Sequence, residues 1–221
     1  MTDIDRRRAA LGLTLMAAGG VAVACSRGGN ARAAQSAAAA GQVRPDLNNC
    51  DGCEAVAERD PAGIPSRVIL AGPDEPGERM LLEGRVLATD RVTPAEGVVI
   101  YAHQTNAEGL YANGGPETVW SRRHGRLRGW VRTGADGRYA FETIKPAPYP
   151  SMTMPAHIHL FIGEPGRRPY YIDDVVFEGE FGVTPDYRAR SELRGGEGVV
   201  RLTRENGVWQ ARRDIRLETH P

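Results

Sequence analysis

Hydrophobic residues from about residue 80 onward occur in short runs, many of them β-branched, separated by glycine, proline and charged residues. Runs this short predict strands rather than helices. We expect strands at 81–87, 97–102, 128–133, 138–144, 157–162, 170–177, 199–203 and 208–217, and one short helix within 185–193. The spacing therefore predicts an all-β fold, a β-sandwich of roughly seven or more short strands.

Two pairs of these strands are joined by dipeptides that favour tight hairpin turns. Asp136-Gly137 lies between the third and fourth expected strands, and Asn206-Gly207 lies between the last two. Both dipeptides accept the positive φ angles of two-residue hairpin turns. The composition agrees, because 27 glycines and 15 prolines in 221 residues favour many short elements separated by turns.

The first part of the chain has the pattern of an export signal followed by a flexible tether. Three consecutive arginines precede an apolar stretch at 9–24 that ends in small residues, which is typical of a signal peptide. Paired arginines favour the twin-arginine route over an ordinary arginine-rich secretory signal. We therefore expect an export signal over 1–25, a tether over 26–41 and a periplasmic or membrane-anchored extracytoplasmic location.

The three cysteines agree with an oxidising compartment. Cys25 ends the expected signal in a sequence that resembles a lipoprotein processing site, so this cysteine is a candidate for a lipid anchor. Cys50 and Cys53 predict a small-loop disulfide. A redox-active pair and half of a zinc site are the alternatives. The pair lies in the segment 42–79, which we expect to wrap irregularly around a sandwich domain at 80–221.

The charge balance argues against a nucleic-acid partner. The chain has 28 Lys and Arg and 28 Asp and Glu, a formal net charge of 0 at pH 7. Nucleic-acid-binding domains normally carry a basic excess. Four arginines that are close in sequence are expected to form a solvated surface: Arg122, Arg123, Arg126 and Arg128.

The strongest local signal for chemistry is a His-x-His within an apolar strand. Side chains two residues apart in a strand point to the same face. His157 and His159 would therefore project together, while Ile158 and Leu160 face the core. Burying two imidazoles without polar partners is costly, and two adjacent imidazoles are half of a metal site. The pattern predicts metal ligation.

Glu164 is one candidate to complete this site. It follows the two histidines with the spacing of the first metal motif of cupins. However, Ser151 stands where that motif has glycine, and no second histidine-bearing motif follows. A cupin-like site that holds a different metal is therefore the minor alternative.

A resemblance to a known family indicates other partners. The segment 136–150 with the following His-x-His, and the segment 106–111 upstream, resemble the intradiol ring-cleavage dioxygenases. This is the family of catechol 1,2-dioxygenases and protocatechuate 3,4-dioxygenases, and the order of tyrosine, hairpin, tyrosine and His-x-His is a specific combination. The resemblance implies a β-sandwich that holds one non-haem Fe(III) per chain through Tyr111, Tyr149, His157 and His159.

The same resemblance implies the chemistry. A catechol-type ring would be cleaved by O2 between its two hydroxyl-bearing carbons to give a muconate-type dicarboxylate. Tyr149 is the implied catalytic ligand, which leaves the metal and takes up a substrate proton. A bound metal lowers the pKa of a tyrosine far below its usual value of about 10. Tyr101 and His103 are the candidates for substrate contacts, and Tyr139 is assigned to the core.

The chain departs from the family three residues before His157. Met154 stands where members usually carry an arginine that is implied to stabilise the electron-rich bound ring. An exported β-sandwich that keeps the metal and binds a ligand without turnover is therefore the alternative function. Asp173 and Asp174 are expected to be exposed charges at a strand end, and the alternative makes them hydrogen-bond partners of the histidines.

Overall fold

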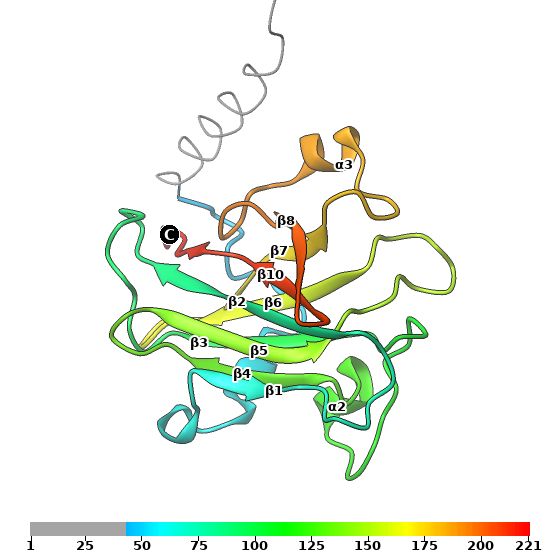
Figure 1. Cartoon of the computed structure of the whole chain (residues 1–221). Helices are drawn as coiled ribbons and strands as arrows, with labels where there is room; N and C mark the ends of the chain where they lie inside the picture. The colour runs from blue at the N-terminus through cyan, green and yellow to red at the C-terminus, as the bar shows by residue number, and fades with distance from the viewer. Residues whose placement is uncertain (1–42) are drawn as a thin grey trace, which may run out of the picture.

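The computed structural model describes residues 43–221, which fold into two β-sheets packed face to face (Figure 1). The prediction of an all-β sandwich is confirmed. The expected export signal, the tether and Cys25 lie outside the described residues. Between residues 43 and 221, no helix is long and apolar enough to cross a membrane.

Within these residues, one sheet has six strands and the other has five. The first sheet has the order β1 (Arg67–Ile69), β5 (Arg138–Ile144), β2 (Arg79–Leu87), β10 (Val208–Arg212) and β9 (Leu202–Glu205), and β11 (Ile215–Arg216) pairs with β2. The second sheet has the order β4 (Arg128–Arg132), β3 (Val99–Gln104), β6 (His157–Gly163), β7 (Tyr170–Phe177) and β8 (Val199–Val200). Two short helices precede the first strand, η1 (Cys53–Glu58) and η2 (Pro61–Gly63), and two lie between strands, α2 (Val119–His124) and α3 (Pro185–Arg190).

The core lies between the two sheets, because the strands turn alternate side chains inward. Phe141 from the first sheet belongs to the same buried cluster as Ile100 and Leu160 from the second. Full burial of each such side chain stabilises the fold by about 1.5–3 kcal/mol. Tyr139 belongs to this core as predicted, and its buried hydroxyl donates to the Arg213 carbonyl at 2.7 Å.

Most expected strands are present, although some are divided in two and others begin or end at different residues. β5 and β7 have the predicted limits, and the last expected strand is divided into β10 and β11. Asn206 (φ 50°) and Gly207 (φ 83°) adopt the positive φ angles of the expected hairpin turn, which joins the antiparallel pair β9 and β10. The hairpin expected at Asp136-Gly137 is wrong: Gly137 has a positive φ (69°), but the turn carries the chain from β4 in one sheet to β5 in the other. β1 and α2 were not predicted from the pattern. β1 has only three residues, too few to show a periodicity, and it is held by parallel pairing with β5.

Before β2 the chain is largely irregular, but it includes η1, η2 and β1. Val56 from η1 packs against a cluster that includes Tyr101 and Phe161 on the second sheet. Nε1 of Trp130 donates to the Ala55 carbonyl at 2.9 Å. Cys50 and Cys53 are joined in a disulfide at the start of η1. This helix therefore covers the outer face of the sheet that carries the His-x-His.

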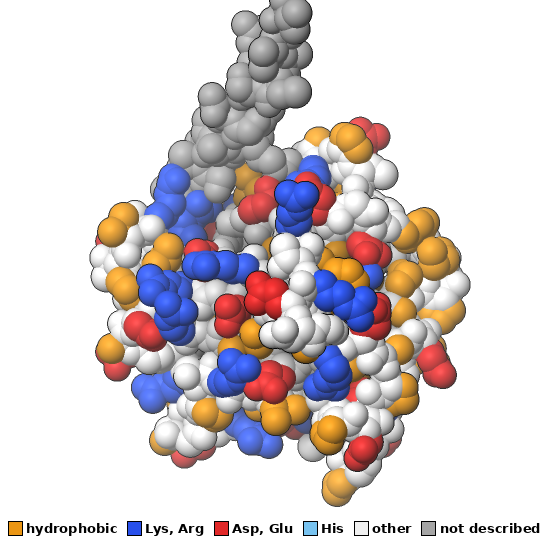
Figure 2. Space-filling model, in the orientation of Figure 1, with side chains coloured by type: hydrophobic (Ala, Val, Ile, Leu, Met, Phe, Trp, Pro, Cys, Tyr) orange, Lys and Arg blue, Asp and Glu red, His pale blue; other side chains and the backbone are white. Residues whose placement is uncertain are grey.

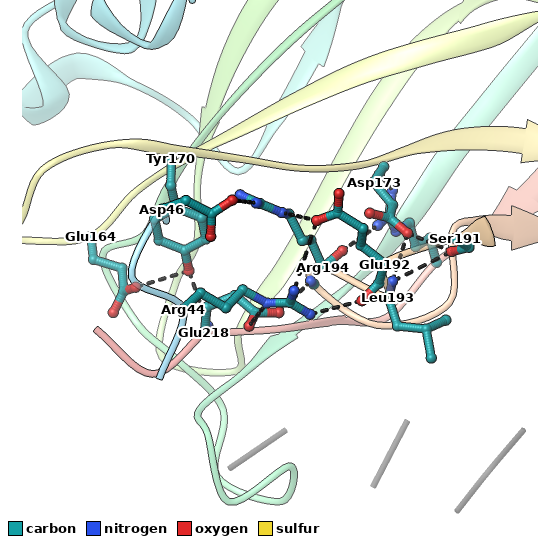
Figure 3. A network of polar contacts seen from close by, with 12 residues as sticks. Arg44, Asp46, Glu164, Tyr170, Asp173, Ser191, Glu192, Leu193, Arg194 and Glu218 are labelled. Atoms are coloured by element: carbon teal, nitrogen blue, oxygen red, sulfur yellow. Dashed lines mark hydrogen bonds and ion pairs between the residues drawn. The ribbon is translucent and has the colours of Figure 1, made fainter. Parts of the chain in front are cut away.

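Ion pairs fasten residues near the start of the described chain to its C-terminal part (Figure 3). Nε of Arg44 donates to Glu218 at 3.0 Å, and Arg194 binds the Asp46 carboxylate at 2.5 Å. The Glu218 side chain is only 2% exposed, so salt screens its ion pair less than a surface pair. Arg194 also accepts a backbone hydrogen bond from Asp173 at 3.1 Å, which connects this network to β7.

Candidate metal centre

His157 and His159 lie on β6 and project from the face opposite to the core. Ile158 and Leu160, which alternate with them, are buried as predicted. Nδ1 of His157 lies 2.7 Å from the carbonyl oxygen of Pro155. Because a carbonyl oxygen only accepts hydrogen bonds, Nδ1 carries the imidazole proton. Nε2 of His157 therefore presents a lone pair.

Asp174 on β7 orients His159 in the same way. Nδ1 of His159 lies 2.9 Å from Oδ1 of Asp174. Burial acts to raise the pKa of the Asp174 carboxyl, but the neighbouring His159 outweighs burial and holds this pKa below its usual value. The ionised carboxylate accepts the Nδ1 proton, so Nε2 of His159 also presents a lone pair.

The expectation that Asp173 and Asp174 are exposed strand-end charges is wrong. The Asp174 side chain is only 10% exposed. Asp173 accepts hydrogen bonds from Ser191 Oγ at 2.6 Å and from the Leu193 backbone at 2.9 Å. Both carboxylates lie within β7 rather than at its end, because the strand continues to Phe177. The alternative, a hydrogen-bond partner of the histidines, describes Asp174.

Tyr111 and Tyr149 meet the two histidines and close a ring of four donor atoms. The Tyr111 hydroxyl lies 3.0 Å from the Tyr149 hydroxyl and 3.0 Å from Nε2 of His159. The Tyr149 hydroxyl lies 3.2 Å from Nε2 of His157. The two Nε2 atoms are 3.0 Å apart. We call these two oxygens and two nitrogens the donor ring; it contains one atom from each of the four residues predicted as metal ligands.

The two tyrosines come from neighbouring loops that are fixed to each other. Thr105 Oγ1 donates to the Ala147 carbonyl at 2.7 Å, and the Ala147 backbone donates to Asn106 at 3.2 Å. Gly109 has a φ of 78°, and a Cβ at this position would lie only 2.1 Å from the Pro148 carbonyl oxygen. Glycine is therefore required where the Tyr111 loop crosses the Tyr149 loop.

The donor ring contains too few protons for its four close contacts. Neither Nε2 atom has a proton, and the two hydroxyls supply one each. Two of the four contacts therefore remain between lone pairs, whichever way the hydroxyls turn. A cation at the centre would replace this repulsion with four favourable contacts. Edges of 3.0–3.2 Å leave a centre about 2 Å from each atom, a normal metal–ligand distance. The residues fit a metal ion.

Burial keeps two of the donor residues neutral when no cation is present. It raises the pKa of the Tyr111 hydroxyl far above its usual value, and Tyr149 adds to the shift. Burial also lowers the pKa of His157. Neutral imidazole is the form that binds a metal. A phenolate at Tyr111, by contrast, requires a cation beside it.

Tyr101 and His103, the sequence candidates for substrate contacts, lie beside the donor ring but are buried. The His103 ring centroid is 4.4 Å from that of His159 and 5.6 Å from that of Tyr111. On its other side His103 stacks on His124 at 4.0 Å, and the Tyr101 hydroxyl lies 2.8 Å from Nδ1 of His124. His124 was not singled out from the sequence, because it ends the unpredicted helix α2.

A cavity of about 380 Å³ adjoins this histidine group. His103, His124 and His159 line it together with Asp174. Burial lowers the pKa of His103 well below its usual value and lowers that of His124 to about 4. Both imidazoles are therefore uncharged at neutral pH. These two imidazoles can accept or donate hydrogen bonds in the cavity without adding positive charge. Arg123, which also lines the cavity, is paired with Asp51 at 2.5 Å.

Glu164 does not join the histidines. Its carboxylate accepts a hydrogen bond from the Tyr170 hydroxyl at 2.9 Å and pairs with His220 at 2.8 Å. A strand advances about 3.3 Å per residue, so Glu164 lies roughly 17 Å along the chain from His159. Among residues 43–221, the group of His, Cys, Asp and Glu close enough to hold a metal is His157, His159 and Asp174. The cupin-like alternative is wrong.

The arginines of 122–128 do not all form a solvated surface. Arg122 and Arg123 are exposed as expected, with 68% and 49% of their side chains accessible. Arg126 instead pairs with Glu75 at 2.8 Å, and the Arg128 side chain, which pairs with Glu58, is only 11% exposed. The last two arginines connect the sheet to the N-terminal segment.

Comparison with known proteins identifies a family for this chain. A family model described as Dioxygenase matches residues 65–195, a range that contains all four residues of the donor ring. The chain belongs to the intradiol ring-cleavage dioxygenase family. Catechol 1,2-dioxygenase 1 of Acinetobacter lwoffii, a relative within this family, is 32% identical over 102 residues, which are 45% of this chain and 32% of the relative. Chlorocatechol 1,2-dioxygenase of Rhodococcus opacus is 34% identical over 137 residues, 54% of this chain and 49% of that enzyme. The chain thus spans half or less of the length of these two dioxygenases.

A solved structure of similar size also matches the sandwich. It is the dioxygenase domain of a dioxygenase–carbohydrate-binding protein fusion from Streptomyces sp. SirexAA-E. The two structures have a TM-score of 0.55 and 25% sequence identity, over 71% of this chain and 90% of that domain. The similarity to this dioxygenase domain therefore extends over most of the described chain.

Proposed function

We propose that this protein is an exported non-haem Fe(III) dioxygenase that uses O2 to cleave a catechol-type ring between its two hydroxyl-bearing carbons. The donor ring is the observation that carries the proposal. It joins two phenol oxygens and two imidazole nitrogens with edges of 3.0–3.2 Å. Membership of the intradiol family supports the same reaction class.

Tyr111, Tyr149, His157 and His159 would hold one iron per chain. Ferric iron, when bound, draws electron density from a chelated catecholate and makes its ring reactive toward O2. Phenolate oxygen is a hard anionic ligand that suits the ferric state. Two phenolates also balance two of the three positive charges of Fe(III). Their negative charge therefore favours Fe(III) over Fe(II).

The residues around the donor ring prepare it for substrate. The Pro155 carbonyl and Asp174 fix the tautomers of the two histidines, so both Nε2 atoms are ready to bind without rearrangement. Tyr149 is partly exposed at the ring, and a phenolate at this position can accept a proton from a substrate hydroxyl at its oxygen. We assign this proton transfer to Tyr149.

The export part of the proposal rests on the signal pattern and on the cysteines. The disulfide between Cys50 and Cys53 suits an oxidising compartment. Mass spectrometry of the mature N-terminus tests this part: cleavage near residue 25 supports export, and a lipid on Cys25 supports a membrane anchor. A mature protein that begins at Met1 and remains in the cytoplasm would contradict it.

The decisive experiment is a visible spectrum of the purified protein with its iron content, recorded before and after addition of catechol, followed by oxygen uptake. We expect one iron per chain, a broad tyrosinate-to-iron absorption band that shifts with catechol, and consumption of O2. A coloured, iron-loaded protein that binds catechol but takes up no O2 would support the alternative, a binding protein without turnover. Met154, in place of the arginine that family members usually carry, favours that alternative. A colourless protein loaded with another metal would refute the iron–tyrosinate site.

A further inference from the structure

Exposed hydrophobic side chains lie on the loops that carry, or contact, the residues of the donor ring. We call four of them the apolar rim: Leu110, Met152, Met154 and Phe181. Their exposed fractions are 47%, 48%, 37% and 50%. Leu110 directly precedes Tyr111, and the two methionines lie between Tyr149 and His157. Single exposed hydrophobic residues are ordinary, but several beside one site mark a binding surface.

Contacts between three loops bring the rim residues to one side of the molecule. The loop of Leu110 crosses the loop after β5 at Gly109 and Pro148. The loop of Phe181 is joined to the end of β5 by the Lys145–Glu180 ion pair, 2.6 Å long. A Cβ at Gly182 would lie 3.3 Å from Pro155, two residues before His157. Figure 2 shows hydrophobic side chains along the edge where Figure 1 places the loop between β5 and β6.

Met152 occupies a backbone conformation that disfavours its side chain. Its φ is 52°, and its backbone donates to the Tyr149 carbonyl at 2.8 Å to close a turn. Glycine adopts this left-handed conformation without strain, and bulky residues rarely do. Strain of this kind concentrates at functional sites. The turn holds the Met152 side chain, 48% exposed, three residues after the donor residue Tyr149.

We propose that the preferred substrates are catechols that carry an extended apolar substituent, such as a branched alkyl or aryl group, and that the apolar rim holds this substituent. The inference rests on the proposed function, which places the two catechol oxygens at the donor ring. Substituents on the far side of the ring then extend toward the rim. Methionine side chains adapt to ligands of different shape. The four rim side chains are uncharged, so they offer a carboxylate substituent no ionic partner. Arg190 lines a pocket with Met154, but it shares that pocket with the carboxylates of Asp173, Asp174 and Glu192.

Spectroscopic titration of the iron-loaded protein tests the inference through binding rather than turnover. The ligands are catechol, 4-tert-butylcatechol and 3,4-dihydroxybenzoate, each followed by the shift of the visible band. We expect the Kd of 4-tert-butylcatechol to be about tenfold lower than that of catechol, because several methyl groups leave water. The Kd of 3,4-dihydroxybenzoate should not be lower than that of catechol.

Two variants and one matched control locate the effect. Phe181→Ser and Met152→Ser should each bring the ratio of the catechol Kd to the 4-tert-butylcatechol Kd toward one. Val92→Ser removes a still more exposed hydrophobic side chain, 79% accessible, from the connection between β2 and β3. This control should leave the ratio unchanged.

Three results would overturn the inference. Equal affinities of the wild type for catechol and 4-tert-butylcatechol would show that the rim does not hold the substituent. An unchanged ratio in both rim variants would place the preference elsewhere. A wild-type dimer in sedimentation velocity that Phe181→Ser dissociates would assign the rim to an interface between copies. In each of these three cases catechol still shifts the visible band of the wild type, so the proposed function stands. If catechol does not shift that band, the proposed function itself fails.

Discussion

The Asp174 carboxylate accepts a hydrogen bond from His159 at 2.9 Å, whereas the corresponding nitrogen of His157 donates to a backbone carbonyl at 2.7 Å. The two histidines of the donor ring are therefore not equivalent. An anionic partner makes an imidazole more basic and fixes its orientation. His159 is thus the stronger electron donor of the pair, and Asp174 is the residue responsible.

Asp174→Asn should weaken iron binding by about 10–100-fold, because a neutral amide makes the His159 imidazole less basic than a carboxylate does. Competition with an iron chelator measures the affinity. Glu164→Gln is the matched control, since it neutralises a carboxylate at the other end of β6. We expect the control to bind iron as the wild type does. Loss of iron from Glu164→Gln, with Asp174→Asn unaffected, would contradict the donor ring.

Tyr149→Phe should lower kcat by about 10²–10⁴-fold, the usual contribution of a positioned proton acceptor. The visible band should weaken and persist, because Tyr111 still supplies a phenolate. The Tyr111→Phe, Tyr149→Phe double variant should be colourless. Tyr139→Phe removes a core hydroxyl bonded to Arg213, so it should lower stability and leave the band intact. A double variant that keeps the band would show that other residues hold the iron.

Gly109→Ala should disturb both stability and the metal site. A Cβ there would lie 2.1 Å from the Pro148 carbonyl oxygen at a φ of 78°. Gly115 has a similar φ of 83° with open space around it, so Gly115→Ala reports the backbone penalty alone. We expect Gly109→Ala to lose about 1–3 kcal/mol more free energy of unfolding than Gly115→Ala, because of overpacking. Urea denaturation measures both; equal losses would mean that the loops separate freely.

The stability of the protein should fall as pH decreases from about 6.5 to about 4, partly because of His124. Burial, with the nearby Arg123, lowers the pKa of His124 from 6.5 to about 4 in the folded chain. In this range the unfolded chain binds a proton that the folded chain does not, which favours unfolding. Above pH 6.5 this contribution is constant.

His124→Gln tests this pH dependence. Glutamine keeps a polar partner for the Tyr101 hydroxyl and does not titrate. The free energy of unfolding should therefore decrease less between pH 7 and pH 5 in the variant than in the wild type, as measured by urea denaturation of the iron-loaded proteins. Protonation of the iron ligands affects both proteins equally. Identical slopes would show that the pKa of His124 is the same in the folded and unfolded chains.

The strands that could be predicted are those with a strong local pattern. β5 and β6 are each seven residues long and rich in apolar residues, so the sequence of each segment alone predicts a strand. β1 has three residues and becomes a strand only because β5 offers it a free edge. α2 has six residues and depends on the mutual capping of Thr118 and Ser121, a signal too weak to stand alone in a long loop.

The sequence by itself determined the sandwich and the two histidines of the donor ring, because strand periodicity and side-chain chemistry are local properties of the chain. Tyr111 and Tyr149 were predicted from the resemblance to the intradiol dioxygenase family. Only the tertiary structure decided which residues surround them. Asp174, and not Glu164, accepts the hydrogen bond from His159, because β7 is the antiparallel neighbour of β6. The apolar rim likewise exists because three loops distant in sequence end at the same edge. Contacts of this kind follow from which strands become neighbours, and no single stretch of sequence encodes them.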